Sequence, residues 1–398
     1  MKEILFISTL NLATNPRLVK EIDLAIKSNY SVTVVCFEFN NWSKINNDDL
    51  ISRFKNVEFI LIPAGRRPFV PWLFNLLKEK IYRLFGSFAP LATSQISQSV
   101  SRRSNLLINA IKKVHHADLV IGHNPGAIYP TLFVAKKFNC PSGFDVEDYH
   151  PGEYNNRNLQ QITLLLIKKL LPKFNYVSFA SELIKNRIEE DFNFKSKNWF
   201  SILNYFPSNE FIEPISRLGE KIKFVWFSQN IKKGRGVKEF LELFQMIDNA
   251  ELHLYGHLDN HFFENELSKY KNIIVHQNIT QKQLHLELSL YDIGLALDIA
   301  NDENRDLAIT NKIIAYLQSG LFVLASNISA HKYIINHNQT HGVCFTNSID
   351  DNIHLLKKIL SDIETIRQNK IKRYNRFKDY CWEKESVLLI NKWEALLY

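Results

Sequence analysis

The sequence predicts an α/β chain built from two Rossmann-like, doubly wound domains in series. Short β-rich runs alternate with helical stretches in both halves of the 398-residue chain. These runs are almost continuously apolar, which is typical of parallel strands whose two faces are covered by helices. A polar stretch interrupts the alternation once, and the pattern then begins again. Ligands of such sheets bind beyond the carboxyl ends of the strands, so we expect the two domains to face a cleft lined by those ends.

The first domain is expected over residues 1–206. Helical patterns at 16–28 and 103–115 separate its candidate strands. Those strands are expected at 3–9, 32–37, 57–62, 118–122, 142–146 and 176–180.

The second domain is expected over residues 221–375, after a linker at 207–220 that contains two prolines and shows no periodicity. Its candidate helices are 237–246, 281–290 and 311–319. Its candidate strands are expected at 221–228, 251–255, 272–276, 292–297 and 321–325.

The composition is that of a globular protein that buries a large core, with 45% hydrophobic and 23% charged residues. No apolar run approaches the roughly 20 residues that a membrane span needs, and the first residues are too polar for a signal peptide. We therefore expect a cytoplasmic protein that does not span a membrane. The four cysteines lie far apart without a CxxC pair, so we interpret them as small buried hydrophobes and expect no metal.

The formal charge of +8 is uneven, because residues 1–200 carry 26 Lys/Arg against 17 Asp/Glu, a balance of +9. A basic first half fits an anionic membrane surface, a phosphorylated acceptor or nucleic acid. It fits simple solubility equally well.

Asn15, Pro16 and Arg17 follow the first candidate strand. Asn is a good N-cap and Pro suits the first helical position. The helix N-terminus offers free N–H groups to an anion, so Asn15 and Arg17 are candidate donor-binding residues. The alternative is that Asn15 and Pro16 only cap the helix and that Arg17 points into solvent.

His123, Asp145 and Glu147 lie at the ends of two neighbouring candidate strands, and we predict them to be the catalytic residues. A histidine at such a place can transfer a proton or donate a hydrogen bond to a sugar hydroxyl. The carboxylates, crowded with Asp148, suit binding of an acceptor hydroxyl or acid–base work. A structural histidine and a solvated acidic loop are the alternatives.

Ser228, Lys233 and Arg235 lie in a strand-to-helix turn that contains two glycines. Glycines let the backbone approach a diphosphate and the cations neutralise it, so these residues are predicted to bind the donor, together with Gly256 in the next glycine turn. No GxxxxGK[ST] motif occurs in the chain, so this is not a P-loop. A basic surface turn is the alternative.

Asn311 and Lys312 open a helix after a long polar loop. Capping explains Asn311, but a lysine in a first helical turn opposes the helix dipole. We therefore predict that Lys312 is placed to meet the negative charge of a bound ligand.

These motifs, in this order, resemble the GT-B glycosyltransferases, and in particular family 4-like enzymes of bacterial surface-polysaccharide synthesis. The resemblance covers nearly the whole chain. The matching segments are Asn15-Pro16-Arg17 with Val19-Lys20-Glu21, residues 117–123, 144–154, 179–182 and 202–207, Asn311-Lys312 through Gly320, and residues 380–383. The resemblance implies that the last segment, within 376–398, is a helix that crosses back onto the first domain.

The chain departs from the family pattern at the donor site. Two glutamates eight residues apart are usual there, and the matching positions are Leu307 and Ala315. Glu303 is a possible substitute for one of them. The histidine of the family's acidic motif is Glu147 here.

The resemblance implies a hexosyltransferase-like enzyme that moves a sugar from a nucleotide diphosphate sugar to a hydroxyl acceptor, either a saccharide or a lipid-linked one. It implies a retaining reaction without metal or cofactor, in which His123 binds and polarises the substrate. Lys233, Arg235 and a helix N-terminus would stabilise the leaving diphosphate.

Residues 66–88 combine five Lys/Arg with large apolar side chains, which fits an amphipathic segment on an anionic membrane surface. We thus consider a peripheral location on the inner face of the plasma membrane. A helix packed on its own core is the alternative. Rival functions are a catalytically inactive GT-B binding or activating subunit, a nucleotide-sugar epimerase and, ranked last because no such module is present, a nucleic-acid binder.

Overall fold

The computed structural model describes residues 1–66, 69–85, 91–215, 221–336 and 340–398, and it divides the chain into two compact units. The first unit contains Met1–Ile202 and Ser386–Tyr398, and the second contains Leu203–Glu385. Residues 203–215, which include most of the expected linker, thus belong to the second unit, where Phe206 and Phe211 are buried in its core. Residues 216–220 of that linker lie outside the described residues, as do 67–68 and 86–88 of the expected membrane segment.

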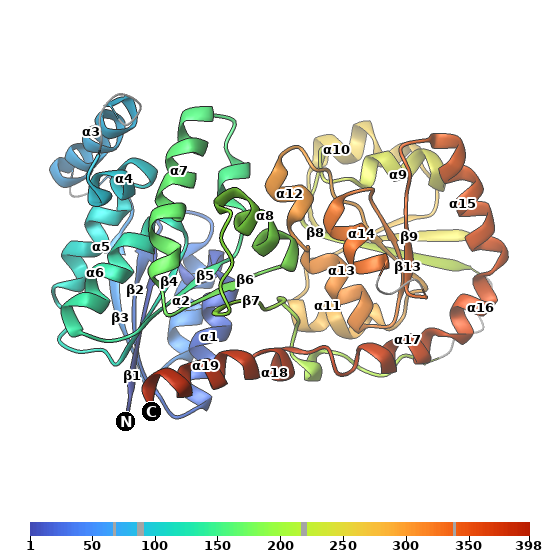
Figure 1. Ribbon diagram of the computed structural model, residues 1–398. Coiled ribbons are helices and arrows are strands. Elements are labelled where there is room, and N and C mark those ends of the chain that lie inside the picture. Colours follow the sequence, from blue (N-terminus) through green and yellow to red (C-terminus); the bar gives the residue numbers. More distant parts are fainter. Residues whose placement is uncertain (67–68, 86–90, 216–220, 337–339) are drawn as a thin grey trace. The chain divides into compact units, whose positions relative to one another are not determined.

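The first unit is built on a parallel sheet whose described strands run in the order β3-β2-β1-β4-β5-β6-β7 (Figure 1). The order reverses between β1 and β4, which is the topological switch point of the sheet. The strands are β1 (Glu3–Ser8), β2 (Ser31–Glu38), β3 (Val57–Pro63), β4 (Leu119–His123), β5 (Ser142–Val146), β6 (Tyr176–Phe179) and β7 (Trp199–Ser201).

Helices connect these strands, and the last helix of the chain also belongs to this unit. The helices are α1 (Pro16–Lys27), α2 (Lys44–Arg53), α3 (Phe69–Phe85), α4 (Thr93–Val100), α5 (Arg103–Ile111), α6 (Ile128–Phe138), α7 (Arg157–Leu170), α8 (Glu182–Phe192) and α19 (Val387–Leu397). Trp393 of α19 is buried against Phe6 and Tyr30, and its indole N–H donates to the Tyr176 hydroxyl at 2.8 Å. Both chain ends therefore lie close together in this unit (Figure 1).

The second unit repeats the topology with a parallel sheet in the order β10-β9-β8-β11-β12-β13 among the described residues. Its switch point lies between β8 and β11. The strands are β8 (Ile222–Ile231), β9 (Ala250–Leu258), β10 (Ile273–His276), β11 (Ile293–Ala296), β12 (Phe322–Ala325) and β13 (Gly342–Cys344). The helices are α9 (Val237–Phe244), α10 (Asn260–Asn265), α11 (Gln281–Leu288), α12 (Glu303–Leu307), α13 (Asn311–Gln318), α14 (Ser329–Asn336), α15 (Ile349–Ser361), α16 (Ile363–Gln368), α17 (Lys370–Phe377) and α18 (Trp382–Glu385).

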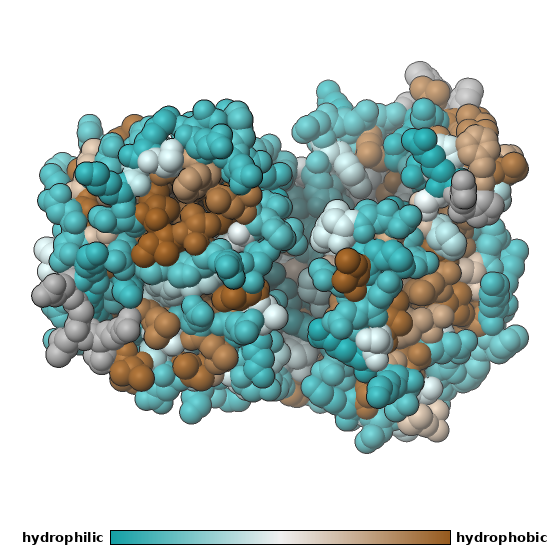
Figure 2. Space-filling view, turned by 180° about the vertical axis from the view of Figure 1, so that it is seen from behind, coloured by the Kyte–Doolittle hydropathy of each residue, from teal (hydrophilic) through white to brown (hydrophobic). Residues whose placement is uncertain are grey.

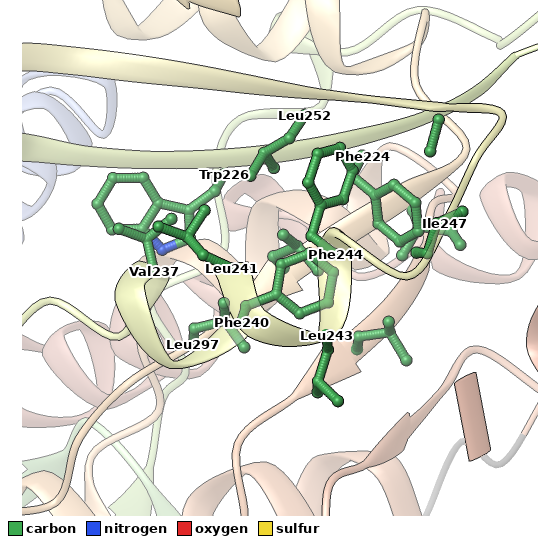
Figure 3. Close-up of a cluster of buried hydrophobic side chains, with 14 of the residues drawn as sticks. Phe224, Trp226, Val237, Phe240, Leu241, Leu243, Phe244, Ile247, Leu252 and Leu297 are labelled. Atoms are coloured by element: carbon green, nitrogen blue, oxygen red, sulfur yellow. The ribbon is translucent and has the colours of Figure 1, made fainter. Parts of the chain in front are cut away.

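A buried hydrophobic cluster fixes α9 on the second sheet (Figure 3). Phe240, Leu241 and Phe244 lie on one face of α9, as the 3.6-residue period of a helix requires. They pack against Phe224 and Trp226 of β8. This packing positions the turn between β8 and α9, which contains the predicted basic residues.

The predicted parallel strands are confirmed, with boundaries shifted by up to three residues. The sequence patterns did not indicate β7 or β13, which are three-residue strands at sheet edges. Cys36 and Cys381 are buried as expected, Cys140 and Cys344 are half-buried, and all four are free thiols.

One helix of the first unit departs from ordinary core packing. The side chains of Val70, Phe74, Leu77, Ile81 and Leu84 on α3 are 46–74% exposed. Figure 2 shows hydrophobic side chains at the surface in the region of this unit where α3 lies. Among the described residues, no helix is both long enough and apolar enough to cross a membrane.

Candidate functional site

Four polar side chains form a row across the carboxyl ends of the first sheet. The parallel register pairs Ser8 of β1 with His123 of β4, His123 with Asp145 of β5, and Asp145 with Ser178 of β6. All four residues are buried. Strand register alone therefore brings together two of the predicted catalytic residues at the switch point, where ligands of such sheets bind.

Arg17 forms a buried ion pair with Asp145. Its Nε and Nη2 donate to the two carboxylate oxygens at 2.7 and 2.6 Å, and its Nη1 donates to the Ile202 carbonyl at 2.8 Å. The Ser178 hydroxyl also donates to Asp145, at 2.6 Å. The Arg17 guanidinium is therefore buried and paired within the first unit, and its predicted contact with the donor stays a prediction. The pairing keeps the pKa of Asp145 low although burial opposes it.

His123 lies between carboxylates on both sides of its ring. Its Nδ1 is 3.2 Å from Glu147 and 3.7 Å from Asp145, and its Nε2 is 3.4 Å from Glu21. Burial opposes the charged form, but these carboxylates outweigh it and raise the pKa of His123 to about 10. The ring is therefore an imidazolium at neutral pH, and neither nitrogen can accept a proton.

Glu21 is a member of this cluster that the sequence patterns did not indicate. It lies one helical turn after Arg17 on the buried face of α1, next to Leu18 and Ile22. Burial raises the pKa of Glu21, while the charge of His123 opposes the rise. Two cations, Arg17 and His123, thus face the three carboxylates of Glu21, Asp145 and Glu147.

The cluster does not fit a metal ion, although ligand atoms of Glu21, His123 and Asp145 lie within 4.8 Å of one another. Both oxygens of Asp145 already accept hydrogen bonds from Arg17. A cation bound there would have to displace a guanidinium, and its own charge would oppose the His123 imidazolium. A second group, Asp148, His150 and Glu153, is only partly buried, and the Glu153 carboxylate raises the pKa of His150 against the effect of burial.

Asn15 caps α1, as its sequence position predicts. Its side-chain oxygen accepts from the Leu18 amide at 3.0 Å. The residue is buried, and its amide nitrogen makes no hydrogen bond within the described ranges of the chain. That nitrogen is a donor available to a group that enters beside the helix N-terminus.

The basic turn of the second unit lies at the switch point of that sheet. Gly236, with φ +90°, packs so closely on the loop after β11 that an added Cβ would lie 2.3 Å from the Leu297 carbonyl oxygen. This contact places Lys233 and Arg235, both exposed, beside the residues that follow β11. Two predicted donor-binding segments are thus brought together, as neighbouring carboxyl ends of β8 and β11 require.

Ser228 and Gly256 meet at a bulge in β8. A Cβ on Gly256, whose φ is +146°, would lie 2.2 Å from the Ser228 carbonyl oxygen. The bulge therefore requires glycine at this position. This contact explains Gly256 without a ligand, and the predicted donor contacts of Gly256 and Ser228 stay predictions.

Lys312 has a partner within the protein. Its Nζ donates to Asp298 at 2.7 Å, and the Thr310 hydroxyl donates to the same carboxylate at 3.0 Å. The buried ring of His331 lies 3.5 Å from the other side of that carboxylate. Burial raises the pKa of Asp298, but His331 and Lys312 together hold it well below its ordinary value. This acidic partner was not predicted from sequence, although Asp298 is the second residue after β11.

The two positions where the family pattern has glutamates differ in their surroundings. Leu307 is the last residue of α12 and is half-buried, whereas Ala315 is buried in the core of the second unit. Glu303 is exposed in the first turn of α12. Asn311 is exposed and its side chain accepts a hydrogen bond from Asn204 at 3.1 Å.

Comparisons with known proteins agree on the fold alone. No family model matches the chain, and no curated protein matches it. A glycosyltransferase structure from Rickettsia africae is similar over 100% of this chain and 98% of its own, at 14% identity and a TM-score of 0.68. Sucrose-phosphate synthase from Thermosynechococcus elongatus is similar over 100% of this chain and 99% of its own, at 13% identity and a TM-score of 0.67. HepE from Anabaena, solved with UDP, is similar over 100% of both chains, at 12% identity and a TM-score of 0.66. The predicted α/β fold with two parallel sheets of the GT-B type is therefore confirmed.

Proposed function

We propose that this protein is a glycosyltransferase that moves a sugar from a nucleotide diphosphate sugar to a hydroxyl acceptor. One observation carries the proposal: the basic, glycine-containing turn before α9 is packed against the loop that leads to Asp298 and Lys312, at the switch point of the second sheet. Exposed cations, a glycine-bounded turn and the N-terminus of α9 are the groups that a diphosphate requires. Similarity of fold to solved glycosyltransferases supports the same conclusion.

The donor diphosphate would be neutralised by Lys233 and Arg235 and by free N–H groups at the start of α9. These groups stabilise the charge that develops on the leaving group, so the proposed reaction needs no metal ion. The Asp298–Lys312 pair would orient the nucleotide sugar. The Lys312 ammonium carries three N–H groups, so those that do not bond to Asp298 can donate hydrogen bonds to the nucleotide sugar. The proposed reaction is retaining, as in the family that the sequence resembles.

The acceptor side would use the cluster of the first unit. An imidazolium with both nitrogens facing carboxylates cannot be a general base, so His123 would act as a fixed positive charge. Glu147 is the most exposed member of the cluster, at 13% for its side chain. It is therefore the carboxylate that an acceptor hydroxyl can reach, with Asp145 held behind it by Arg17.

The acceptor is proposed to be a saccharide or lipid-linked saccharide of cell-surface polysaccharide synthesis. The exposed apolar stripe on α3 supports a lipid-linked acceptor, because Lys78, Lys80 and Arg83 share the helix with it. Cations beside an exposed apolar helical face are the features that bind an anionic membrane surface. We thus propose a cytoplasmic protein bound peripherally to the inner face of the plasma membrane.

Calorimetric titration with UDP, GDP and CDP, and with their sugars, tests the donor site. We expect one nucleotide to bind, and Lys233→Gln and Arg235→Gln each to weaken it about tenfold, since a charge-assisted hydrogen bond contributes about 1.5–3 kcal/mol. Lys357→Gln, an exposed lysine on α15, is the matched control. Equal affinity in all three variants would show that the basic turn does not hold the diphosphate.

A catalytically inactive binding subunit is the second candidate, and Leu307 and Ala315 favour it because neither can supply a carboxylate. Product analysis separates the possibilities. Nucleotide release together with a glycosylated acceptor supports the transferase, binding without turnover supports the subunit, and conversion of the donor to an epimer supports a nucleotide-sugar epimerase.

A further inference from the structure

A cavity of about 650 Å³ lies in the second unit, away from the donor site. It is bounded by the strands β12 and β13 and by α15, α16 and α17. Phe322 is the first residue of β12 and His341 directly precedes β13, so the cavity opens at the amino ends of these strands. The donor site lies at the carboxyl ends of the same sheet. A volume in this range is typical of sites for small molecules.

One wall of the cavity is apolar. Phe322 and Val343 come from the sheet, Leu355 and Ile359 from α15, and Ile366 from α16. Ile359 and Ile366 also belong to the buried core of this unit. The wall is therefore held in place by core packing and is suited to the apolar part of a ligand.

The other side of the cavity is cationic. Lys358, Lys372, Arg373 and Arg376 line it against a single carboxylate, Asp362, which leaves a balance of +3. Within the described part of the chain, none of these four cations forms an ion pair. An excess of positive charge over an apolar wall favours an anionic ligand.

Arg373 is the buried member of this group. It is 3% exposed, and its Nε and Nη2 donate to the carbonyls of Gly320 and Ile366 at 3.0 and 2.8 Å. Its Nη1 makes no hydrogen bond to any residue that the structure describes. Desolvation lowers the pKa of Arg373 to about 10, so a negative charge beside it would recover part of the cost of burying a cation.

We propose that this cavity is a binding site for an apolar molecule that bears a phosphate group. The apolar wall takes the hydrocarbon, and Arg373 with Lys372 and Arg376 takes the phosphate. A dianionic phosphate matches the +3 balance better than a monoanionic carboxylate does. The site is separate from the donor site and does not depend on the proposed transferase activity.

Octyl phosphate, used below its micelle concentration, is the probe for calorimetric titration of the full chain. We expect it to bind, with inorganic phosphate and octanol each at least about tenfold weaker, a difference of about 1.4 kcal/mol. The double variant Lys372→Gln/Arg376→Gln should lose at least about tenfold in affinity for the same reason. Leu355→Trp, which fills the cavity without changing its charge, should lose a similar amount.

Matched controls lie on the same helices outside the cavity. Lys357→Gln on α15 and Lys378→Gln after α17 remove exposed cations and should bind octyl phosphate as the wild type does. Unchanged binding in either the double variant or Leu355→Trp would overturn the proposal, as would absence of binding to the wild type. UDP titration of the same variants should be unaffected, so failure of this site and failure of the donor site are measured separately.

Discussion

At the scale of single residues, the most unusual feature is the buried charge cluster of the first unit. The cluster contains five ionisable side chains. Removing one partner of a buried ion pair leaves the charge of the other buried without compensation. Arg17 is paired with Asp145 by two hydrogen bonds. We expect Arg17→Met to destabilise the protein by about 3–5 kcal/mol, measured by urea unfolding. Arg17→Met/Asp145→Asn should recover part of that loss, whereas additive losses would show that the two residues do not interact.

The protonation of His123 makes a pH-dependent contribution to stability. Its folded-state pKa of about 10 lies above the ordinary value of 6.5. The imidazolium therefore stabilises the fold fully below pH 6.5, and this stabilisation is lost as the pH rises toward 10. We expect the difference in unfolding free energy between the wild type and His123→Gln to shrink over this range. A constant difference between the wild type and His123→Gln over this range would contradict the assignment.

The contribution of Asp298 to stability should have the opposite pH dependence. Its pKa is depressed in the folded state, so its contribution is present above pH 3.8 and is lost as the pH falls through the folded-state value. Lys312→Met removes one of the two partners, Lys312 and His331, that lower this pKa. We expect a loss of about 1–3 kcal/mol at neutral pH and an acid-unfolding midpoint at higher pH than in the wild type. A midpoint equal to that of Lys332→Met, an exposed control on α14, would show that Lys312 does not set it.

Individual side chains were predictable from sequence only where chain position determined their surroundings. His123 and Asp145 were singled out because they lie at or near the ends of buried strands, and register then makes them neighbours. Glu21 and Asp298 were missed because no local sequence pattern marks a carboxylate as paired. The expectation that Lys312 meets the negative charge of a ligand did not include Asp298 for this reason, and the ligand contact stays a prediction.

At the scale of elements, α3 shows that apolar periodicity predicts a helix with an apolar face but not which surface covers that face. Val70, Phe74, Leu77, Ile81 and Leu84 recur at helical spacing, which predicts one apolar face but does not say what covers it. In the first unit these side chains are exposed. Long strands were predicted well because a continuous apolar run between turn residues is typical of a strand covered on both faces. The three-residue edge strands β7 and β13 carry too few residues for such a pattern.

We expect α3 to bind anionic vesicles. Leu77→Ser/Ile81→Ser removes two large side chains from the exposed stripe, and burial of such side chains contributes about 1.5–3 kcal/mol each. The double variant should therefore remain in the unbound fraction in a vesicle flotation assay, while the wild type floats. Ile45→Ser, at an exposed site on α2, is the matched control. Flotation of the double variant with the wild type would contradict a role for this helix.

At the scale of the whole molecule, the first unit is discontinuous in sequence. Residues 386–398 return to it after the complete second unit. Trp393 anchors this return, since it is buried and hydrogen-bonded to Tyr176. We expect Trp393→Ala to destabilise the first unit by about 3–5 kcal/mol. Hydrogen exchange should then increase in β1, β4 and β6 but not in β8 or β11, whereas equal increases in both units would contradict selective anchoring by Trp393.

This connectivity has a consequence for biosynthesis. A ribosome releases the strands of the first unit long before it releases α19, and the whole second unit emerges in between. The second unit can therefore complete its core while the chain is still being synthesised. The first unit cannot complete its core until Trp393 has left the ribosome. During that interval the surface around Phe6 and Tyr30, which Trp393 later covers, is open to solvent and to chaperones. Nascent chains arrested before α19 should be cleaved by protease in the first unit while the second resists.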